Sequence, residues 1–361
     1  PEEGQVEFSR KGSKTEADVH MRDVANLIIQ SNPDIVNLVE VENGEALSTL
    51  NKDFLAGRGY RPYFIKGKDH YTGQDVALLT RIDPEGETIA RDDRTAQAGS
   101  VSKGVSKNYI ATFNLPQVKI AFIGLHFLAQ PNREDRRDDR EAQAKVIARQ
   151  AIELKNRGYD VVVLGDFNDY DGDTDCLDQQ DSAPITNVLR ICKKMASDDP
   201  ADDLVNAARF VPKSQRYTAF WDQNDNDRVD FPRELSSIDH VLLAPRLAGM
   251  VTHTAIPHDH DPRRVTDHFP VVVRLRLSDQ AAGAGGTLRI VALVPNPSGN
   301  ESQNEEVTIR NLTSAKMSLK GWTRRDLAGK TWSLDSADGI DAGDEVRIKR
   351  LGQAMAMNNN G

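Results

Sequence analysis

Apolar residues recur at helical spacing in two segments of the first 278 residues. The segments span 16–30 and 133–157, and each predicts an amphipathic helix because residues three and four apart lie on one helix face. The mixed charges over 133–140, which open the second segment, are interpreted as a solvated face. The expected inward stripes are Val19, Val24, Leu27 and Ile28 in the first helix, and Ala144, Ile147, Ala151 and Leu154 in the second.

Short apolar runs between and after these helices are typical of buried strands. Helices and strands are mixed, yet several strands follow one another without a helix between them. This order favours a layered α/β sandwich over a doubly wound parallel sheet, so we expect an α/β domain over 1–278. The predicted strands span 35–39, 76–79, 109–113, 119–125, 161–164, 241–243 and 271–277.

A change of composition marks the end of this domain. The segment 279–286 contains the run Ala-Ala-Gly-Ala-Gly-Gly, which predicts a flexible linker. The rest of the chain, 287–361, contains short strand patterns separated by turn residues, and it predicts a small all-β sandwich domain. The strand patterns span 288–294, 306–310, 330–334 and 345–349.

Composition and charge exclude several classes of protein. The chain has 361 residues and a formal net charge of −9, of which residues 287–361 contribute about +1. It therefore lacks the basic excess of a protein that binds along nucleic acid, and contact with a polyanion would need bound cations. No run approaches the ~20 apolar residues of a membrane span. Two cysteines, Cys176 and Cys192, allow one disulfide or two buried thiols and exclude a cysteine-based zinc site.

Polar residues cluster at five predicted strand ends. A carboxylate in such a place is usually a cap or turn residue when it occurs alone. Loops at the strand ends of one sheet are also common places for functional sites, so five such placements together indicate a site. The candidate residues are Glu40, His126, Asp166, Asn168, Asp239, Asp267 and His268.

These residue types match the chemistry of a hard divalent cation. Glu40 and Asp267 offer the oxygen ligands that Mg²⁺ prefers. Histidines with carboxylate partners suit proton transfer near neutral pH. No hydroxyl or thiol stands in a nucleophile motif, so water is the expected attacker. The combination predicts metal-assisted hydrolysis of a phosphoester.

Four motifs follow Glu40 in the order found in the endonuclease/exonuclease/phosphatase superfamily, whose members include pancreatic deoxyribonuclease. The chain resembles this superfamily over roughly 16–277, which implies a four-layered α/β sandwich and a phosphodiesterase that uses Mg²⁺ or Mn²⁺. Residues 287–361 resemble a lamin-tail domain, an immunoglobulin-like sandwich, through 305–311, 319–322 and 329–334. The four motifs are Gly124-Leu-His126, Gly165-Asp-Phe-Asn168, Ser237-Ile-Asp-His240 and Thr266-Asp-His268.

The superfamily resemblance implies roles at the metal and the attacking water. Glu40 is expected to bind the metal, with Asp267 as a further metal or water-mediated ligand. Asp166 and Asn168 are expected to position the attacking water and hold phosphoryl oxygens. The family also opens with a strand that ends in an Asn beside the metal. Here only Val6-Glu-Phe8 precedes the first helix and no matching Asn is present, which puts full activity in question.

The resemblance also implies roles for two histidines. Asp239 is expected to orient His268, which would act as the general base or contact the phosphate. His126 would be the opposing acid or phosphate donor. The family places a carboxylate beside this second histidine, and Asp75 is the candidate, with Gln74 as the rival one position earlier.

A second cation site is a hypothesis at residues 222–230. Four oxygen side chains there occupy positions 1, 3, 5 and 9 of an EF-hand-like loop. The glycine of position 6 is replaced by Asp227, and position 12 is Arg233, so a structural Ca²⁺ site and a solvated turn both remain open. The four candidate ligands are Asp222, Asn224, Asn226 and Asp230.

The expected function is a secreted nuclease that hydrolyses DNA with little sequence specificity, RNA being left open. Secretion is expected because bacterial extracellular nucleases often pair these two domains. The alternatives are a phosphoesterase of the same superfamily that acts on lipid headgroups or inositol phosphates, and a catalytically impaired binding protein. The low aromatic content, 6%, is against the lipid-acting relatives. The oligomeric state is left open.

Overall fold

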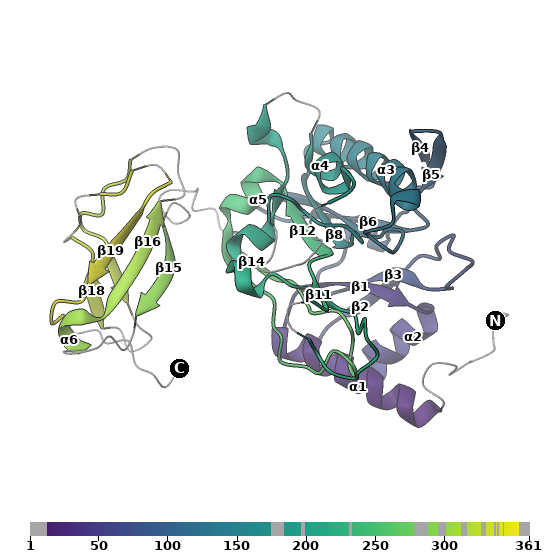
Figure 1. The fold of residues 1–361 in the computed structure, drawn as a ribbon, viewed down its shortest axis with the longest axis horizontal. Helices are drawn as coiled ribbons and strands as arrows, with labels where there is room; N and C mark the ends of the chain where they lie inside the picture. Colours follow the sequence, from purple (N-terminus) through teal and green to yellow (C-terminus); the bar gives the residue numbers. More distant parts are fainter. Residues whose placement is uncertain are drawn as a thin grey trace. The chain divides into compact units, whose positions relative to one another are not determined.

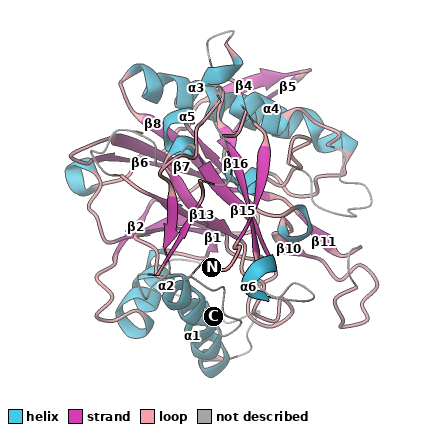
Figure 2. Ribbon diagram, turned by 90° about the vertical axis from the view of Figure 1, so that its left-hand side faces the viewer, coloured by secondary structure: helices cyan, strands magenta, loops and turns pink. Residues whose placement is uncertain are grey.

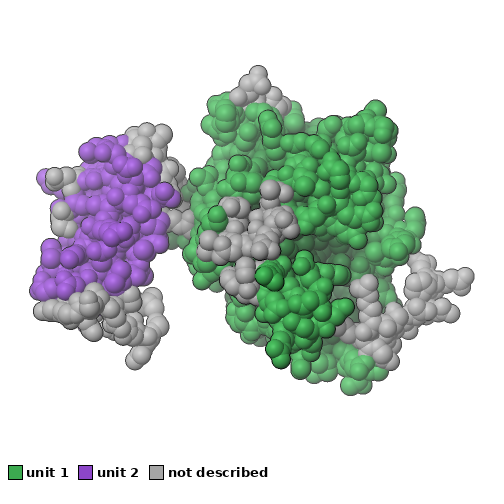
Figure 3. Space-filling view, in the orientation of Figure 1, with its two compact units in different colours: residues 1–277 green, residues 278–361 purple. Residues whose placement is uncertain are grey.

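The chain forms two compact units, residues 1–277 and residues 278–361, which Figure 3 shows in different colours. The structure is a computed structural model. It describes residues 13–174, 184–195, 199–230, 233–277, 288–294, 301–311, 316–325, 330–335, 337, 339–341 and 343–353. The predicted linker over 279–286 lies outside the described residues.

Unit 1 mixes helices and strands, and the two predicted helices and seven predicted strands occur among them in the predicted order (Figure 1). Its helices are α1 (Lys14–Ser31), α2 (Gly44–Thr49), α3 (Arg137–Asn156), α4 (Val188–Lys193) and α5 (Pro245–Gly249). Its strands are β1 (Ile35–Val41), β2 (Arg61–Phe64), β3 (Asp75–Thr80), β4 (Thr95–Ala98), β5 (Val101–Gly104), β6 (Lys107–Asn114), β7 (Lys119–His126), β8 (Asp160–Asp166), β9 (Val205–Asn206), β10 (Ala219–Phe220), β11 (Leu235–Ser236), β12 (Asp239–Leu243), β13 (Val251–Ala255) and β14 (Val272–Leu275).

Three hydrophobic clusters show that unit 1 has four layers. The first cluster lies between α1 and α2 and the sheet of order β1-β3-β2, and it includes Ile28 and Leu79. The second cluster joins this sheet to the sheet of order β6-β7-β8-β12-β9 and includes Leu78 and Phe113. The third lies between the second sheet and α3 and α4, and it includes Ile147. Figures 1 and 2 show the two sheets between the two pairs of helices, as an α/β sandwich requires.

The five-stranded sheet aligns the ends of its strands. β7 and β8 are parallel, with α3 as the crossover between them, whereas β6 and β12 run antiparallel to their neighbours. The register pairs His126 with Asp166 and Asp166 with Asp239. Strand pairing therefore brings three predicted site residues to the same edge.

The two predicted helices are present, with changes at their surfaces. The stripe of α3, from Ala144 to Leu154, is fully buried, as the spacing predicts. In α1 only Ala25 and Ile28 are fully buried, and Val19 is 48% exposed, so its predicted inward position was wrong. Val19 lies in the first half of the helix, which extends beyond the sheet that covers the second half.

The described residues of unit 2 form strands and one short helix. β15 (Leu288–Val294), β16 (Glu306–Asn311) and β19 (Glu345–Lys349) form one sheet, and β17 (Thr323–Arg325) pairs with β18 (Thr331–Ser333). The helix is α6 (Glu301–Asn304). Trp332 of β18 is fully buried in one core with Val307 and Ile348 of the larger sheet. The all-β content agrees with the sequence, and the immunoglobulin-like and lamin-tail assignment stays a prediction.

Two expectations from composition concern membranes and cysteines. In the described part of the chain, no helix is long and apolar enough to cross a membrane. Cys192 is buried, and burial raises the pKa of its thiol. Cys176 lies outside the described residues, so the disulfide question stays open.

Candidate active site

The turn that ends β8 fixes two candidate residues. Gly165 has a φ of +136°, and a Cβ there would lie 2.0 Å from the carbonyl oxygen of Leu125, so only glycine lets β7 and β8 approach here. Asn168 adopts the left-handed region with a φ of +47°, which asparagine tolerates. Its backbone N–H and its Nδ2 donate to the two oxygens of Asp166 at 2.7 and 2.8 Å. Asp166 is therefore held in one orientation by its neighbour in the turn.

The environment of Asp166 disfavours its negative charge. Burial is the main reason that its pKa is raised, and the nearby negative charge of Asp239 adds to the effect. The charge of Glu40 acts in the same direction, whereas His268 and the hydrogen bond from the backbone N–H of Asn168 oppose it. A carboxylate whose pKa is raised toward neutrality can take a proton from water.

Asp239 and His268 form an ion pair beside Asp166. Nδ1 of His268 donates to Oδ2 of Asp239 at 2.8 Å. β10 holds the histidine in place, because His268 bridges to Ala219, and the N–H of Phe220 donates to the carbonyl of Asp267 at 2.8 Å. The pairing that the resemblance implies is thus present in the structure.

This ion pair determines the charge of His268. Burial alone would lower its pKa, but the Asp239 carboxylate, together with the negative charges of Asp166 and Asp267, outweighs burial and raises the pKa to about 10. The imidazolium is therefore the form present at neutral pH. In that form His268 can donate to a phosphate oxygen and cannot accept a proton.

His126 has the opposite protonation state. Its Nε2 lies 3.4 Å from Oδ2 of Asp166, and its side chain is almost completely buried. Burial, and then the positive charges of Lys107 and His268, lower its pKa to about 3. The imidazole is therefore neutral. Its Nδ1 has no hydrogen-bond partner in the described structure, so one buried polar atom remains unsatisfied beside the site.

Two other carboxylates act on His126: Oδ2 of Asp166 lies 3.4 Å from its Nε2, and the negative charge of Asp69 acts against the lowering of its pKa. Asp75 is buried, but its oxygens face the backbone N–H of Gly67 at 2.8 Å and Nζ of Lys66 at 3.0 Å. Since Asp75 is the first residue of β3, its side chain is committed to the turn that precedes the strand.

Glu40 lies at a distortion in the strand that carries it. It has a φ of +58°, and the register of β1 with β3 shifts between Leu38 and Val41. Such bulges redirect side chains. Glu40 is exposed, and Nε2 of Gln74 lies 3.4 Å from its Oε2. Gln74, the rival of Asp75 in the sequence, therefore contacts the predicted metal ligand.

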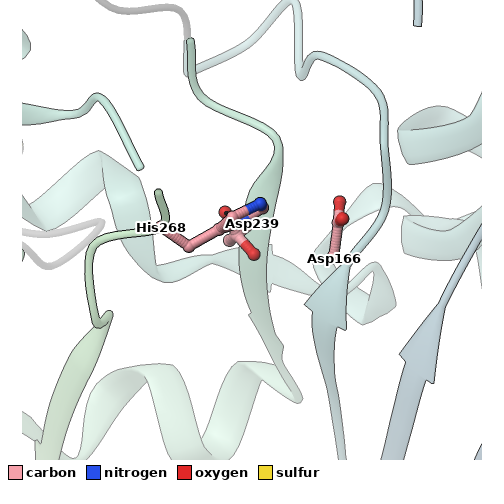
Figure 4. A group of neighbouring side chains, drawn as sticks. All are labelled: Asp166, Asp239 and His268. Atoms are coloured by element: carbon pink, nitrogen blue, oxygen red, sulfur yellow. Dashed lines mark hydrogen bonds and ion pairs between the residues drawn. The ribbon is translucent and has the colours of Figure 1, made fainter. Parts of the chain in front are cut away.

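The site offers the donors that a divalent cation needs. Asp166, Asp239 and His268 each offer one ligand atom, and these three atoms lie within 4.8 Å of one another (Figure 4). Among the described residues this is the one cluster of three acidic, histidine or cysteine side chains that could hold a metal ion. The charge of Glu40 reaches Asp166, and Asp267 is exposed next to His268. Because His268 carries a proton, the carboxylate oxygens are the better ligands, and oxygen donors fit a hard cation. The negative charges of Asp239 and Glu40 raise the pKa of Asp166, and a bound cation would neutralise them.

Sequence reasoning missed a buried arginine beneath the site. Arg140 has no exposed side-chain surface, and its Nε lies 3.1 Å from Oδ2 of Asp169. Its two terminal nitrogens donate to the carbonyls of Gln130 and Pro131 at 2.8 and 2.7 Å. Arg140 thus joins the loop after β7 to the loop after β8, and the interpretation of 133–140 as a solvated face was wrong at this residue. Gln143, three residues later on α3, accepts from the N–H of Leu128 at 3.0 Å, so a second side chain of this helix holds the loop after β7.

The proposed calcium ligands lie in one exposed turn. Asp222 accepts from the backbone N–H groups of Asn226 and Asp227 at 3.2 and 2.9 Å. Asn224 and Asn226 donate to Oδ2 of Asp230 at 2.8 and 2.9 Å. The four residues therefore converge, and the hydrogen bonds of the turn occupy their oxygens. Calcium binding stays a prediction.

Comparisons with known proteins show the family of the chain. The profile of the Endonuclease/Exonuclease/phosphatase family matches residues 6–268. No curated protein matches the chain. Similar solved structures include a family protein from Leptotrichia buccalis, with 15% identity, a TM-score of 0.50, and coverage of 73% of this chain and 95% of that chain. The 3'-5' exonuclease NExo of Neisseria meningitidis has 18% identity and a TM-score of 0.47, covering 72% and 95%. Truncated TDP2 of Caenorhabditis elegans has 16% identity and a TM-score of 0.46, covering 72% and 91%.

Proposed function

The chain belongs to the endonuclease/exonuclease/phosphatase family, and from this premise we propose that it is a divalent-metal-dependent nuclease that hydrolyses phosphodiester bonds of DNA. Members of the family are phosphodiesterases and related hydrolases that depend on divalent metals. The observation that carries the proposal is the convergence of Asp166, Asp239 and His268 at one edge of the five-stranded sheet, with neutral His126 beside them.

Each of these side chains has a separate task in the proposed hydrolysis. Asp166, with its raised pKa, takes a proton from the attacking water. Asn168 fixes the Asp166 carboxylate, and Asp239 holds His268 in its charged form. The imidazolium of His268 donates a hydrogen bond to the phosphoryl group as negative charge develops there. The bond from phosphorus to the leaving oxygen breaks, neutral His126 donates a hydrogen bond to that oxygen, and the leaving group takes its proton from solvent.

The metal would be held by carboxylate oxygens of this site. Glu40 is the ligand that we propose, with the exposed Asp267 as a further or water-mediated ligand and Asp239 close enough to contribute. Mg²⁺ fits because it needs only one or two carboxylates and keeps several waters, and Mn²⁺ is an alternative. Bound there, the cation would supply charge neutralisation for the phosphoryl oxygens.

Three finer parts of the proposal have separate support. DNA as the substrate is favoured because structures of similar fold include a Neisseria 3' phosphatase bound to a product DNA hairpin and a Danio rerio TDP2 with a single-strand DNA product, although both likenesses are of fold only. Secretion rests on the resemblance of residues 287–361 to lamin-tail domains. Structural Ca²⁺ at residues 222–230 rests on the spacing of the four oxygen side chains.

The test is cleavage of defined substrates by the full chain. Supercoiled plasmid, a labelled single strand and a labelled RNA are incubated with Mg²⁺, with Mn²⁺ and with excess chelator. Plasmid nicking that stops in chelator and returns with either metal is expected. Cleavage that continues in chelator would reject the metal-dependent mechanism. Activity only on phospholipid vesicles or inositol phosphates would replace the nuclease proposal by the alternative phosphoesterase.

Variants connect that activity to the site. Asp166→Asn and His268→Asn should each lower kcat by about 10²-fold or more, because each removes a group that acts on the reacting atoms. Asp160→Asn is the matched control, since Asp160 lies at the opposite end of the same strand and pairs with Arg246 at 2.9 Å. The site would be rejected if Asp166→Asn and His268→Asn cleaved the substrate as fast as Asp160→Asn.

A further inference from the structure

The register of the five-stranded sheet extends the site by one strand that the proposed mechanism does not use. Lys107 of β6 is the Cα partner of His126 on β7. His126 pairs with Asp166 on β8, and Asp166 pairs with Asp239 on β12. Directly paired residues in neighbouring strands point to the same face of a sheet. Lys107, His126, Asp166 and Asp239 therefore form a polar row across four strands.

Lys107 is an unusual residue for this position. Its side chain is 8% exposed, close to the 6% and 5% of His126 and Asp166, so all three share the same floor of the site. Lysine is almost never buried unless it is paired. Its partner is Asp69, whose Oδ2 lies 3.2 Å from Nζ of Lys107.

The pairing leaves the lysine bound to one carboxylate, whereas Asp69 has several other partners. The backbone N–H groups of Tyr71 and Thr72 donate to Oδ1 of Asp69 at 2.9 and 3.2 Å, and the hydroxyl of Thr72 donates to Oδ2 at 2.5 Å. Asp69 is thus held by its own loop without Lys107. An ammonium has three N–H donors, so Lys107 keeps capacity for a further acceptor.

The distribution of charge in the row indicates what that acceptor is. The pair of Asp239 and His268 places one cation at one end, and Lys107 places a second cation at the other end. His126 lies between them and feels both positive charges, and its Nδ1 is buried without a hydrogen-bond partner. A phosphodiester is an anion with two non-bridging oxygens, which such a pair of flanking cations fits.

We propose that Lys107 is a substrate-binding residue that contacts a non-bridging oxygen of the scissile phosphodiester beside His126. This inference rests on the proposed function for the identity of the ligand. A compact ammonium serves as a point charge for phosphate. Asp69 is a positioning residue that keeps the ammonium in the row until the substrate arrives.

The test separates binding from turnover. A fluorescent oligonucleotide is titrated into the Asp166→Asn background, with and without Lys107→Met, at several NaCl concentrations. Lys107→Met should weaken binding about 10- to 100-fold, the usual range for a charge-assisted hydrogen bond. It should also reduce the slope of log Kd against log salt by about 0.7 to 0.9, the value of one phosphate contact. Lys107→Arg should restore most of the binding.

Two further variants exclude a purely structural role. Asp69→Asn keeps an oxygen for the backbone N–H groups of Tyr71 and Thr72 but loses the charge that positions Lys107, so binding should weaken less than in Lys107→Met. If Lys107 and Asp69 only stabilised the fold, Lys107→Met and Asp69→Asn would lower the melting temperature and weaken binding to the same extent. Lys119→Met, at the exposed far end of β7, is the matched control and should leave Kd and the salt slope unchanged.

Turnover of a substrate with a single phosphate locates the contact. With bis(p-nitrophenyl) phosphate, Lys107→Met in the otherwise unmodified protein should lower kcat/KM by a factor similar to that on the oligonucleotide. A loss restricted to the oligonucleotide would place the lysine at a neighbouring phosphate and overturn the assignment. If the protein binds the oligonucleotide through Lys107 but cleaves neither substrate, the proposed nuclease function fails while the inference stands. An unchanged Kd and salt slope in Lys107→Met would overturn the inference itself.

Discussion

Replacing Arg140 by Met should destabilise unit 1 strongly, because this side chain is a buried connection between the two loops that carry the site. The substitution keeps a long apolar stem but removes three polar contacts. These are the ion pair with Asp169 at 3.1 Å and the hydrogen bonds to the carbonyls of Gln130 and Pro131. The site residues His126 and Asn168 stand directly before these loops.

The size of the effect follows from what remains buried. Without Arg140, the charge of Asp169 keeps only the hydroxyl of Thr186 at 2.6 Å and the backbone N–H of Tyr170 at 2.9 Å. Removing one partner of a buried ion pair typically costs about 3–5 kcal/mol. For a domain of this size, the melting temperature should fall by roughly 6–20 °C. The measurement is thermal and urea unfolding of the full chain, followed by circular dichroism.

Two controls make this prediction refutable. Arg137→Met removes a neighbouring arginine of α3 whose ion pairs with Glu134 and Glu141 are at the surface, so its unfolding should match that of the parent protein. Adding Asp169→Asn to Arg140→Met removes the unpaired charge and should recover part of the lost stability. If Arg140→Met unfolds like the parent protein, or if the double variant is less stable still, the buried pair does not connect these loops.

Three further predictions concern pH, salt and calcium. His126 binds a proton near pH 6.5 in the unfolded state and only near pH 3 in the folded state, so acid should lower the stability of the folded protein through this residue. The measurement is the unfolding free energy of the parent protein minus that of His126→Gln, both in chelator, and this difference should fall between pH 7 and pH 4. At fixed Mg²⁺ the initial cleavage rate should decline only gently with NaCl, because a domain of about −10 formal charge offers few basic phosphate contacts; a steep decline would reveal a concentrated basic groove. Ca²⁺ should raise the melting temperature of the parent protein and not that of Asp222→Ala, and equal shifts would leave 222–230 a solvated turn.

The layers of unit 1 could be predicted because short apolar runs and helical stripes report burial directly. All seven apolar runs correspond to strands from β1 to β14, and the stripe of α3 from Ala144 to Leu154 is buried throughout. The pairing of Asp239 with His268 could be anticipated only from the resemblance. These two residues are 29 positions apart and meet through β10, which has two residues and gives little pattern to detect.

The remaining features depend on register and on burial of charge, which a single sequence does not show. Lys107 is adjacent to the site because of its cross-strand partner, and a shift of one residue would turn it to the other face. Asp69 lies in a turn rich in polar residues, where nothing distinguishes a carboxylate that caps a loop from one beside an active site. Arg140 occurs in a run of charges, and only the position of α3 over the loops shows that this one is buried.

Net charge was informative about the whole surface but not about this site. The formal value of −9 indicates that few basic side chains are available for a polyanion. Locally, however, the row carries the imidazolium of His268 at one end and the ammonium of Lys107 at the other, each paired with an aspartate. These two ion pairs are neutral as units, so the charge of Glu40, and that of Asp166 whenever it is in its carboxylate form, stays unbalanced toward an approaching phosphate. In the proposed function a divalent cation would remove that repulsion, and the two paired cations would then donate hydrogen bonds to the phosphate between them.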